Sequence, residues 1–446
     1  MTWAEAPQRV TTSCVHTVGF DQVVIAIALR FLLMPRILAV VIAAILSIGA
    51  ASAQDAAPLT LDEAINAARG MSPAIEAASA GVRASNAART IAGLRPNPSL
   101  EAQTENVTGT GPYRRFDSAE TTVGLAVPIE LGGKRPARVA VADAQGDRAR
   151  IEVAIAEADT VLRVTQSYIE AVAAERRLGT ARDQARIAAE ASHAAGVKVA
   201  AGRASPIEQQ RADVLRINAD AAAERAERNL TVARANLARL IGKPVSGGLD
   251  LIWFDRVSGY GPPHPVAAEG TLALAAAETD VAKSNAQISL ARAQRIPDVT
   301  LSASARRFQD TGDTAAVFGL SIPLPLFNNG NAAVAQARAE RDQAEAYRRL
   351  LQRNTEQAIA DAQAEVANAA ATARTTGGPV LAAATEAARI ARIGYREGKF
   401  GQLDLLDAER TLSETRAAAT DALASYHDAE ARLQRLTGAS PSITKD

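Results

Sequence analysis

The sequence predicts a mainly α-helical chain with a membrane β-barrel portion, made of long coiled-coil hairpins and four β-strands. Three observations predict this fold. Alanine-rich helical patterns run for about 60 residues, whereas helices of globular proteins average roughly 10–14 residues. Short segments of alternating polarity interrupt them. The turn at residues 199–214 returns at residues 395–410, which indicates that a whole half of the chain is duplicated.

The composition excludes several functions. The 446 residues carry 49 basic and 49 acidic side chains, so the chain lacks the basic excess that nucleic acids require, and we expect no nucleic-acid partner. The sequence has no nucleophile elbow, phosphate-binding loop or metal-ligand cluster, so we expect neither an enzyme nor a cofactor. The histidines follow no ligand spacing and are interpreted as surface or core residues: His16, His193, His264 and His427.

The N-terminal segment predicts export. Residues 34–53 combine one positive charge, an apolar core and a final Ala51-Ser-Ala53, the pattern of a signal peptide cleaved after Ala53. The apolar run is too short for a membrane span, which needs about 20 residues. We interpret residues 1–33 as an over-called start. Because Cys14 is the only cysteine and precedes the cleavage site, we expect no disulfide, thiol chemistry or lipid anchor.

The first repeat is expected at residues 54–242. A helical pattern fills residues 59–94, with Thr60 as N-cap and Pro73 at the start of a second helix. Residues 99–105 and 121–127 then alternate in polarity, which predicts two strands joined by a loop.

One very long helix is expected from about residue 137 to 199. Its apolar positions step by four and three, which predicts a coiled-coil seam. The seam comprises Ile151, Ile155, Ala158, Leu162, Thr165, Ile169 and Val172. Charged residues are interleaved with it, so the helix cannot span a membrane. The chain turns at residues 200–206 and returns to a stop at Gly242-Lys243-Pro244.

The plan repeats after a linker at residues 243–268, which is rich in proline and glycine. The second repeat is expected at residues 269–440, with a tail at 441–446. Its predicted elements are a helix at 273–295, strands at 299–305 and 317–325, a long helix at about 332–396 and a returning helix. The returning helix places apolar residues seven apart: Leu405, Leu412, Ala419, Tyr426 and Leu433.

The strands have the length that crosses an outer membrane when tilted. Four strands cannot close a barrel, and unpaired edges are costly in lipid. The chain should therefore oligomerise, and two copies would supply eight strands and three copies twelve. The composition does not choose between them. The alternative is a soluble pair of hairpins packed on the helices.

The duplicated order of helix, hairpin, long helix, glycine tip and returning helix resembles the TolC-like outer membrane efflux protein family over residues 54–440. The junction Pro128-Ile-Glu-Leu-Gly-Gly-Lys-Arg135 resembles its heavy-metal (CzcC-like) branch. This resemblance implies a homotrimer with a 12-stranded barrel in outer membrane lipid and an α-helical tunnel in the periplasm. It also implies two partners, a periplasmic adaptor (membrane fusion protein) and an inner-membrane resistance-nodulation-division pump.

The resemblance gives the second tip a role. Channels of this kind carry aspartate rings after that tip in the pattern Gly-x5-Asp-x2-Asp, which matches Gly398, Asp404 and Asp407. Positions three apart share a helix face, so a trimer could place six carboxylates at a periplasmic gate that attracts cations. The alternative is that these are ordinary helix N-terminal acids. This chain departs from the family at Phe400, where a basic gate residue is expected.

The first tip offers Glu208 and Arg211 at the positions equivalent to the two aspartates. The two tips therefore share a fold but not a role.

Both tips are candidates for contact with the adaptor. The residues concerned are Gly202, Arg203, Gly398 and Lys399. The alternative is that the two glycines only permit the reversal of the chain.

The expected function is a passive trimeric conduit that exports divalent heavy-metal cations: cobalt, zinc, cadmium and nickel. Multidrug efflux or type I secretion by the same fold is one alternative. A periplasmic coiled-coil adaptor is another, although an adaptor would normally carry a single hairpin between β-rich domains. A passive tunnel binds its cargo weakly, so the lack of metal-ligand clusters does not decide the cargo.

Overall fold

The computed structural model describes residues 58–258 and 267–441. The predicted signal peptide at residues 34–53 lies outside the described residues, as do Cys14, His16 and His264. Within the described ranges, no helix is long and apolar enough to cross a membrane.

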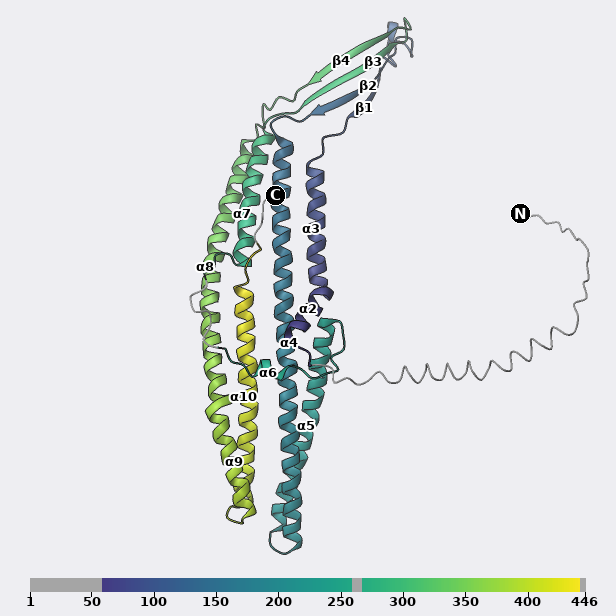
Figure 1. The fold of residues 1–446 in the computed structure, drawn as a ribbon. Helices are drawn as coiled ribbons and strands as arrows, with labels where there is room; N and C mark the ends of the chain where they lie inside the picture. Colours follow the sequence, from purple (N-terminus) through teal and green to yellow (C-terminus); the bar gives the residue numbers. More distant parts are fainter. Residues whose placement is uncertain (1–57, 259–266, 442–446) are drawn as a thin grey trace, which may run out of the picture. The chain divides into compact units, whose positions relative to one another are not determined.

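Two copies of one plan follow each other along the chain (Figure 1). The first copy comprises α2 (Leu61–Met71), α3 (Pro73–Ala92), β1 (Ser99–Glu105), the short helix η1 (Gly111–Tyr113), β2 (Glu120–Ile129), α4 (Lys134–Ala200) and α5 (Pro206–Ile241). After α6 (Leu251–Phe254), the second copy comprises α7 (Leu272–Gln294), β3 (Val299–Phe308), β4 (Thr314–Ser321), α8 (Asn331–Thr375), η2 (Thr376–Val380), α9 (Leu381–Arg396) and α10 (Gln402–Leu436). The predicted fold class is confirmed.

Local signals in the sequence start and stop these helices. Thr60 caps α2, because its hydroxyl accepts from the backbone N–H of Glu63 at 3.3 Å and the Glu63 carboxylate accepts from the N–H of Thr60 at 3.1 Å. This reciprocal capping box satisfies two backbone N–H donors that have no partner within the helix. Pro73 occupies the first turn of α3, and Gly242 ends α5, as expected.

Helix α4 buries more than the predicted seam. Of that seam, Ile151, Thr165, Ile169 and Val172 are buried and the other three residues are half-buried. A second set on α4 is also buried: Val164, Tyr168 and Ala171. The reason is that α3, α5, α7 and α10 all pack against α4, so a single stripe cannot describe its core.

Two predictions in the second repeat were wrong. Strand β4 covers Thr314–Ser321 and not residues 317–325, because Pro323 and Pro325 have no N–H to donate to a neighbouring strand. The long helix predicted at 332–396 is broken between α8 and α9. Inside η2, Gly378 has φ −99° and ψ −105°, outside the helical range, and Pro379 follows it.

The strands form one antiparallel sheet in the order β1-β2-β3-β4 (Figure 1). The central pair β2 and β3 joins the two repeats, with Val123 opposite Ala305. Arg306 on β3 links three strands, because its guanidinium lies 3.2 Å from Glu105 on β1 and 2.8 Å from Glu120 on β2. In Figure 1 the sheet lies at one end of the long helices and the helical tips lie at the other.

The core lies between helices. One cluster joins α4, α5 and α6 through Tyr168, Leu237 and Phe254. A second joins α8 to α10, and the seven-residue series on α10 is buried throughout, from Leu405 to Leu433, as predicted. The segment between the repeats takes part in this core, because Phe254 is fully buried.

Candidate functional site

The first helical tip joins α4 to α5. Gly202 lies there in the left-handed region at φ +67°, which favours glycine, and its N–H donates to the carbonyl of Val199 at 2.9 Å. Ser205 caps α5 by accepting from the N–H of Ile207. Arg203 is exposed at the turn, and Glu208 is half-buried one turn further on.

The second tip joins α9 to α10 with the same geometry. Gly398 has φ +73°, and the N–H groups of Lys399 and Phe400 both donate to the carbonyl of Gly394, at 2.8 and 3.2 Å. Gly398 and Lys399 are exposed. The ring of Phe400 folds back so closely on Gly394 that a Cβ at Gly394 would lie 2.1 Å from it. At the position where the family resemblance predicts a basic residue, this chain therefore has an aromatic ring packed on its own turn.

The two tips touch each other. The ammonium of Lys198, at the end of α4, lies 3.8 Å from the ring centre of Tyr395, at the end of α9. Lys198 and Tyr395 are both half-buried, and cation–π contacts contribute roughly 0.5–1 kcal/mol at exposed sites and about 2 kcal/mol when they are desolvated. The sequence could not reveal this pair, because its members belong to different repeats.

Asp404 and Asp407 lie in the first turns of α10, and both are exposed. The carboxylate of Asp404 accepts from the N–H of Gly401 at 2.9 Å, so it caps its own helix. Asp407 lines a groove of about 600 Å³ between α4, α5 and α10 that also contains Arg211. The acid of the second repeat and the basic residue equivalent to it in the first thus share one groove.

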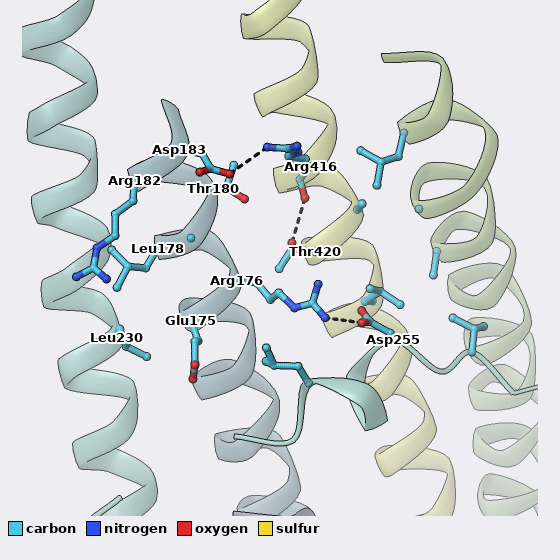
Figure 2. Close-up of a pocket in the computed structure, with 18 of the residues that line it drawn as sticks. Glu175, Arg176, Leu178, Thr180, Arg182, Asp183, Leu230, Asp255, Arg416 and Thr420 are labelled. Carbon is cyan, nitrogen blue, oxygen red and sulfur yellow. Dashed lines mark hydrogen bonds and ion pairs between the residues drawn. The ribbon is translucent and has the colours of Figure 1, made fainter. Parts of the chain in front are cut away.

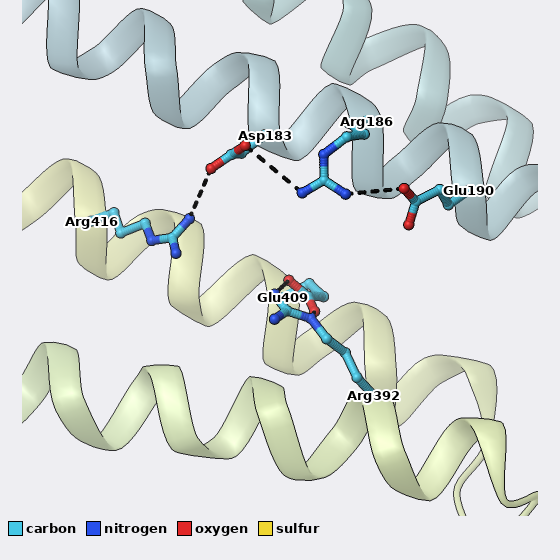
Figure 3. A network of polar contacts seen from close by, with 6 residues as sticks. All are labelled: Asp183, Arg186, Glu190, Arg392, Glu409 and Arg416. Carbon is cyan, nitrogen blue, oxygen red and sulfur yellow. Dashed lines mark hydrogen bonds and ion pairs between the residues drawn. The ribbon is translucent and has the colours of Figure 1, made fainter.

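The sequence analysis missed Glu409, which is 2% exposed on the next turn of α10. Its carboxylate pairs with the guanidinium of Arg392 on α9, with 2.8 Å between Nη2 and Oε2 (Figure 3). The hydrogen bond to Glu409 raises the pKa of Arg392, so the guanidinium remains charged. This pair fastens the two helices of the second hairpin just above its tip.

Polar contacts connect α4 to α10 along their length. From the sheet end towards the tips they are Asp159–Arg435 at 2.5 Å, Gln166–Asp428 at 2.8 Å, Arg177–Asp421 at 2.8 Å and Asp183–Arg416 at 3.5 Å. Asp183 also pairs with Arg186, which pairs with Glu190 (Figure 3). The four contacts between α4 and α10 join residues more than 200 positions apart, so sequence spacing could not predict them.

A larger groove of about 1210 Å³ lies between the two hairpins, above the tips. Figure 2 shows Arg176 paired with Asp255, and Arg416 paired with Asp183, in its wall. Gly377 and Gly378, where the second long helix is broken, line the same groove. Within the described residues, no group of three or more His, Cys, Asp or Glu could hold a metal ion.

The contacts at the junction between β2 and α4 explain why these residues occur there. Glu130 pairs with Arg138, with 3.1 Å between Oε2 and Nη2, and Lys134 pairs with Asp298 of the second repeat at 2.7 Å. Gly132 has φ +73°, and a Cβ there would lie 2.8 Å from Ile296. These contacts hold the first strand pair against the second repeat.

The sequence profile described as Outer membrane efflux protein matches residues 64–243 and 265–439, which is most of the chain and includes both hairpins. The chain belongs to this family. As an outer membrane efflux protein, it is a non-enzymatic channel of the outer membrane with a periplasmic helical extension. The two alternatives of a periplasmic adaptor and of a soluble pair of hairpins are therefore wrong.

Two curated relatives illustrate the range of the efflux protein family. The chain is 31% identical over 399 residues to the cobalt-zinc-cadmium resistance protein CzcC of Cupriavidus metallidurans, covering 86% of this chain and 91% of that one. It is 26% identical over 297 residues to nodulation protein T of Rhizobium leguminosarum bv. trifolii, covering 62% of each chain.

Solved structures of outer membrane proteins share the fold of this efflux protein. The crystal structure of VceC from Vibrio cholerae superposes with a TM-score of 0.70 at 20% identity, covering 85% of this chain and 96% of that one. At this level of identity the likeness concerns the fold alone.

Proposed function

We propose that this outer membrane efflux channel is a passive homotrimeric conduit that exports divalent heavy-metal cations: cobalt, zinc, cadmium and nickel. Its partners would be a periplasmic adaptor and an inner-membrane resistance-nodulation-division pump, which selects the cargo. The observation that carries the cargo proposal is the 31% identity to a cobalt-zinc-cadmium resistance protein across 91% of its length.

The sheet supports assembly from several copies. In the described chain, β1 and β4 each pair on one side only, and lipid penalises unpaired backbone groups at a sheet edge. Because β1 and β4 run antiparallel to each other, β4 of one copy can pair with β1 of the next and keep the ladder antiparallel. Three copies would close twelve strands.

The gate proposal concerns Asp404 and Asp407. We expect the double variant Asp404→Ala/Asp407→Ala to weaken both cation selectivity and block by divalent cations of the channel in a planar bilayer, because a trimer loses six carboxylates at the constriction. Glu208→Ala, at the equivalent position of the first tip, is the matched control and should leave both properties unchanged.

The capping role of Asp404 requires a second variant. Asp404→Asn/Asp407→Asn removes both charges but keeps an acceptor oxygen for the N–H of Gly401. If the asparagine variant behaves like the alanine variant, the carboxylate charge acts on ions. Wild-type selectivity and block in the asparagine variant would contradict the gate proposal.

The tip proposal concerns Arg203 and Lys399, which are exposed beside Gly202 and Gly398. We expect Arg203→Ala/Lys399→Ala to reduce co-purification of the adaptor while the outer membrane trimer still forms. Lys243→Ala, at the far end of α5, is the control for loss of a basic residue. If adaptor capture were undiminished, the tip proposal would be contradicted, and the two glycines would serve only to permit the turn.

The cargo is tested by metal content. A deletion strain should accumulate zinc, cobalt, cadmium or nickel, and the wild-type gene should restore export. The relatives also include a protein named for nodulation and not for metal resistance, so multidrug efflux or secretion is kept as the second candidate, and common drugs and secreted protein should be followed in the same strains. Unchanged metal content together with increased drug content would overturn the metal assignment and leave the channel itself intact.

A further inference from the structure

One face of the sheet is apolar along most of its length. On β3 this face carries every second residue, beginning with Val299, Leu301, Ala303 and Ala305. The neighbouring strands add exposed apolar side chains to the same face: Val123, Leu125 and Val127 on β2, and Phe318 and Leu320 on β4. Because the strands of an outer membrane sheet turn apolar side chains to the lipid and polar ones to the lumen, this is the face that meets the lipid.

The apolar face ends in a row of polar residues that crosses all four strands. Thr104 on β1 is opposite Thr121 on β2. Arg307 on β3 is opposite Thr121 on one side and Thr314 of β4 on the other. All four residues are exposed, and the hydroxyl oxygens of Thr104 and Thr121 lie 3.4 Å apart. The face therefore changes from apolar to polar at the same level of every strand.

This polar row lies at the outer surface of the membrane. Helices α3, α4, α7 and α8 join the sheet at its opposite end (Figure 1), and the helical extension of this family is periplasmic. From Val299 to Arg307 the strand covers about 27 Å, at roughly 3.4 Å per residue, which is about 20 Å across the membrane at a tilt of about 40°. The apolar band of such a sheet is about 25 Å tall, so the long side chain of Arg307 reaches the outer headgroups.

The loop between β1 and β2 adds two further arginines beyond the row. Its segment Tyr113-Arg-Arg-Phe116 is exposed throughout. The hydroxyl of Ser118 donates to the carbonyl of Pro112 at 2.6 Å, which closes the base of this segment. The rim of the sheet thus presents guanidinium groups beside two aromatic rings, and both kinds of side chain are common where a membrane protein meets headgroups. We call Arg114, Arg115 and Arg307 the arginine rim.

The arginine rim forms no ion pair within residues 58–258 and 267–441. Arg306, the neighbour of Arg307 in β3, faces the polar side of the sheet and is instead held by Glu105 and Glu120. Other acids at this end of the sheet are exposed and pair with no arginine in the described part of the chain: Asp117, Asp310 and Asp313. The three guanidinium groups of the rim can therefore bind an anion from outside the protein.

We propose that the arginine rim binds the phosphate groups of lipid A, the glycolipid of the outer leaflet. The acyl chains of the lipid cover the apolar face, which continues directly into the polar row, and its phosphates lie against Arg307 and the loop. A guanidinium donates two parallel hydrogen bonds to a phosphate, and the threonine hydroxyls of the row can donate as well. This surface depends on the place of the sheet in the outer membrane, and not on the cargo or the pump.

Retention of lipid A by the purified channel tests this surface. In native mass spectrometry with added lipid A, the wild-type oligomer should retain the lipid. Arg114→Gln/Arg115→Gln/Arg307→Gln should lower the apparent affinity by about tenfold or more, because three charge-assisted contacts are lost. The control removes three exposed basic residues outside the rim and should leave the affinity unchanged: Arg95→Gln/Arg135→Gln/Lys243→Gln. Both variants should still form the heat-modifiable oligomer.

A change of lipid tests the phosphates without altering the protein, so it decides the question even if the rim variant assembles poorly. The wild type should bind monophosphoryl lipid A several-fold more weakly than the diphosphoryl form, whereas the rim variant should bind both alike. Equal affinity of the wild type for the two forms, or undiminished binding by the rim variant, would overturn the proposal. Phosphatidylglycerol supplies a phosphate without the sugar, and its retention as tightly as diphosphoryl lipid A would overturn the assignment to lipid A.

Discussion

At the scale of single residues, the acids that follow the second tip have different surroundings although they lie within two turns of one helix. Asp404 accepts from the N–H of Gly401, Asp407 is exposed in a groove beside Arg211, and Glu409 is buried against Arg392. The helical period separates Glu409 from Asp407, because residues two apart point in different directions. Proximity in the sequence therefore does not imply a common role.

The pair of Arg392 and Glu409 gives the first prediction. Arg392→Ala leaves a buried carboxylate without a partner, which usually costs roughly 3–5 kcal/mol; solvent reduces the loss here to on the order of 2 kcal/mol because Arg392 is half exposed. Amide exchange at the tip of α9 and α10 should then become roughly 30-fold faster. Arg389→Ala, which breaks an exposed pair with Glu386 on the same helix, is the control.

Equal exchange rates in the Arg392 and Arg389 variants would show that the buried pair does not hold the second hairpin together.

At the scale of elements, the two outgoing helices follow one plan but differ in continuity. Helix α4 runs unbroken for 67 residues, whereas its counterpart is divided by η2 into α8 and α9. The cause is local: two glycines followed by a proline remove side-chain packing and one N–H from the helix. The second hairpin therefore has a point of weakness that the first lacks.

This difference predicts unequal protection. Amides of residues 376–383 should exchange faster than those of residues 178–185 in α4. Gly378→Ala/Pro379→Ala should restore helical hydrogen bonds and slow exchange there by about tenfold. Gly179→Ala, in the unbroken helix, is the matched control and should slow exchange by only a few-fold, in line with about 0.5–1 kcal/mol. Equal protection of the two wild-type segments would contradict this interpretation.

The junction between β2 and α4 gives a second prediction at this scale. Gly132→Ala places a Cβ 2.9 Å from the backbone oxygen of Ala293 as well as against Ile296, so neither neighbour can yield easily. Gly133→Ala has the same left-handed backbone, at φ +72°, but its nearest neighbour would be 3.8 Å away. We expect Gly133→Ala to lower the free energy of unfolding by about 1–2 kcal/mol, which is the cost of a left-handed backbone at a residue other than glycine.

Gly132→Ala should lower the free energy of unfolding by more than Gly133→Ala does. It should also reduce the yield of heat-modifiable oligomer in outer membranes at least several-fold relative to Gly133→Ala. Equal yields of the two variants would show that close packing against the second repeat is not what requires Gly132.

Periodic signals made most elements predictable from the sequence. The seven-residue series on α10, the capping box at Thr60 and the alternation of β1 and β2 all depend on neighbours within one element. The features that were missed depend on distant partners. The packing of α4 on four helices, the contact of Lys198 with Tyr395 and the stacking of His427 on Trp253 join residues that no local pattern connects.

At the scale of the whole molecule, the sheet is the feature that favours assembly from several copies. Its four strands have two edges, and the residues on one of its faces are largely polar while those on the other are largely apolar, as a membrane strand requires. The two hairpins continue from this sheet, so the number of copies that closes the strands also sets the number of helical hairpins in the tunnel. Three copies would give six tips and a ring of six aspartates.

Intermolecular cross-linking of β1 to β4 tests this claim most directly. Cys14 is the only natural cysteine, so in a Cys14→Ser background one engineered pair per chain reports a single contact. Gln103→Cys on β1 is combined in turn with Ala315→Cys, Val317→Cys or Gly319→Cys on β4, which share one face of the sheet. For at least one pair, oxidation in outer membranes should give dimers and trimers on a denaturing gel and nothing larger. Products that stop at the dimer, or no product for any pair, would contradict the twelve-stranded assembly.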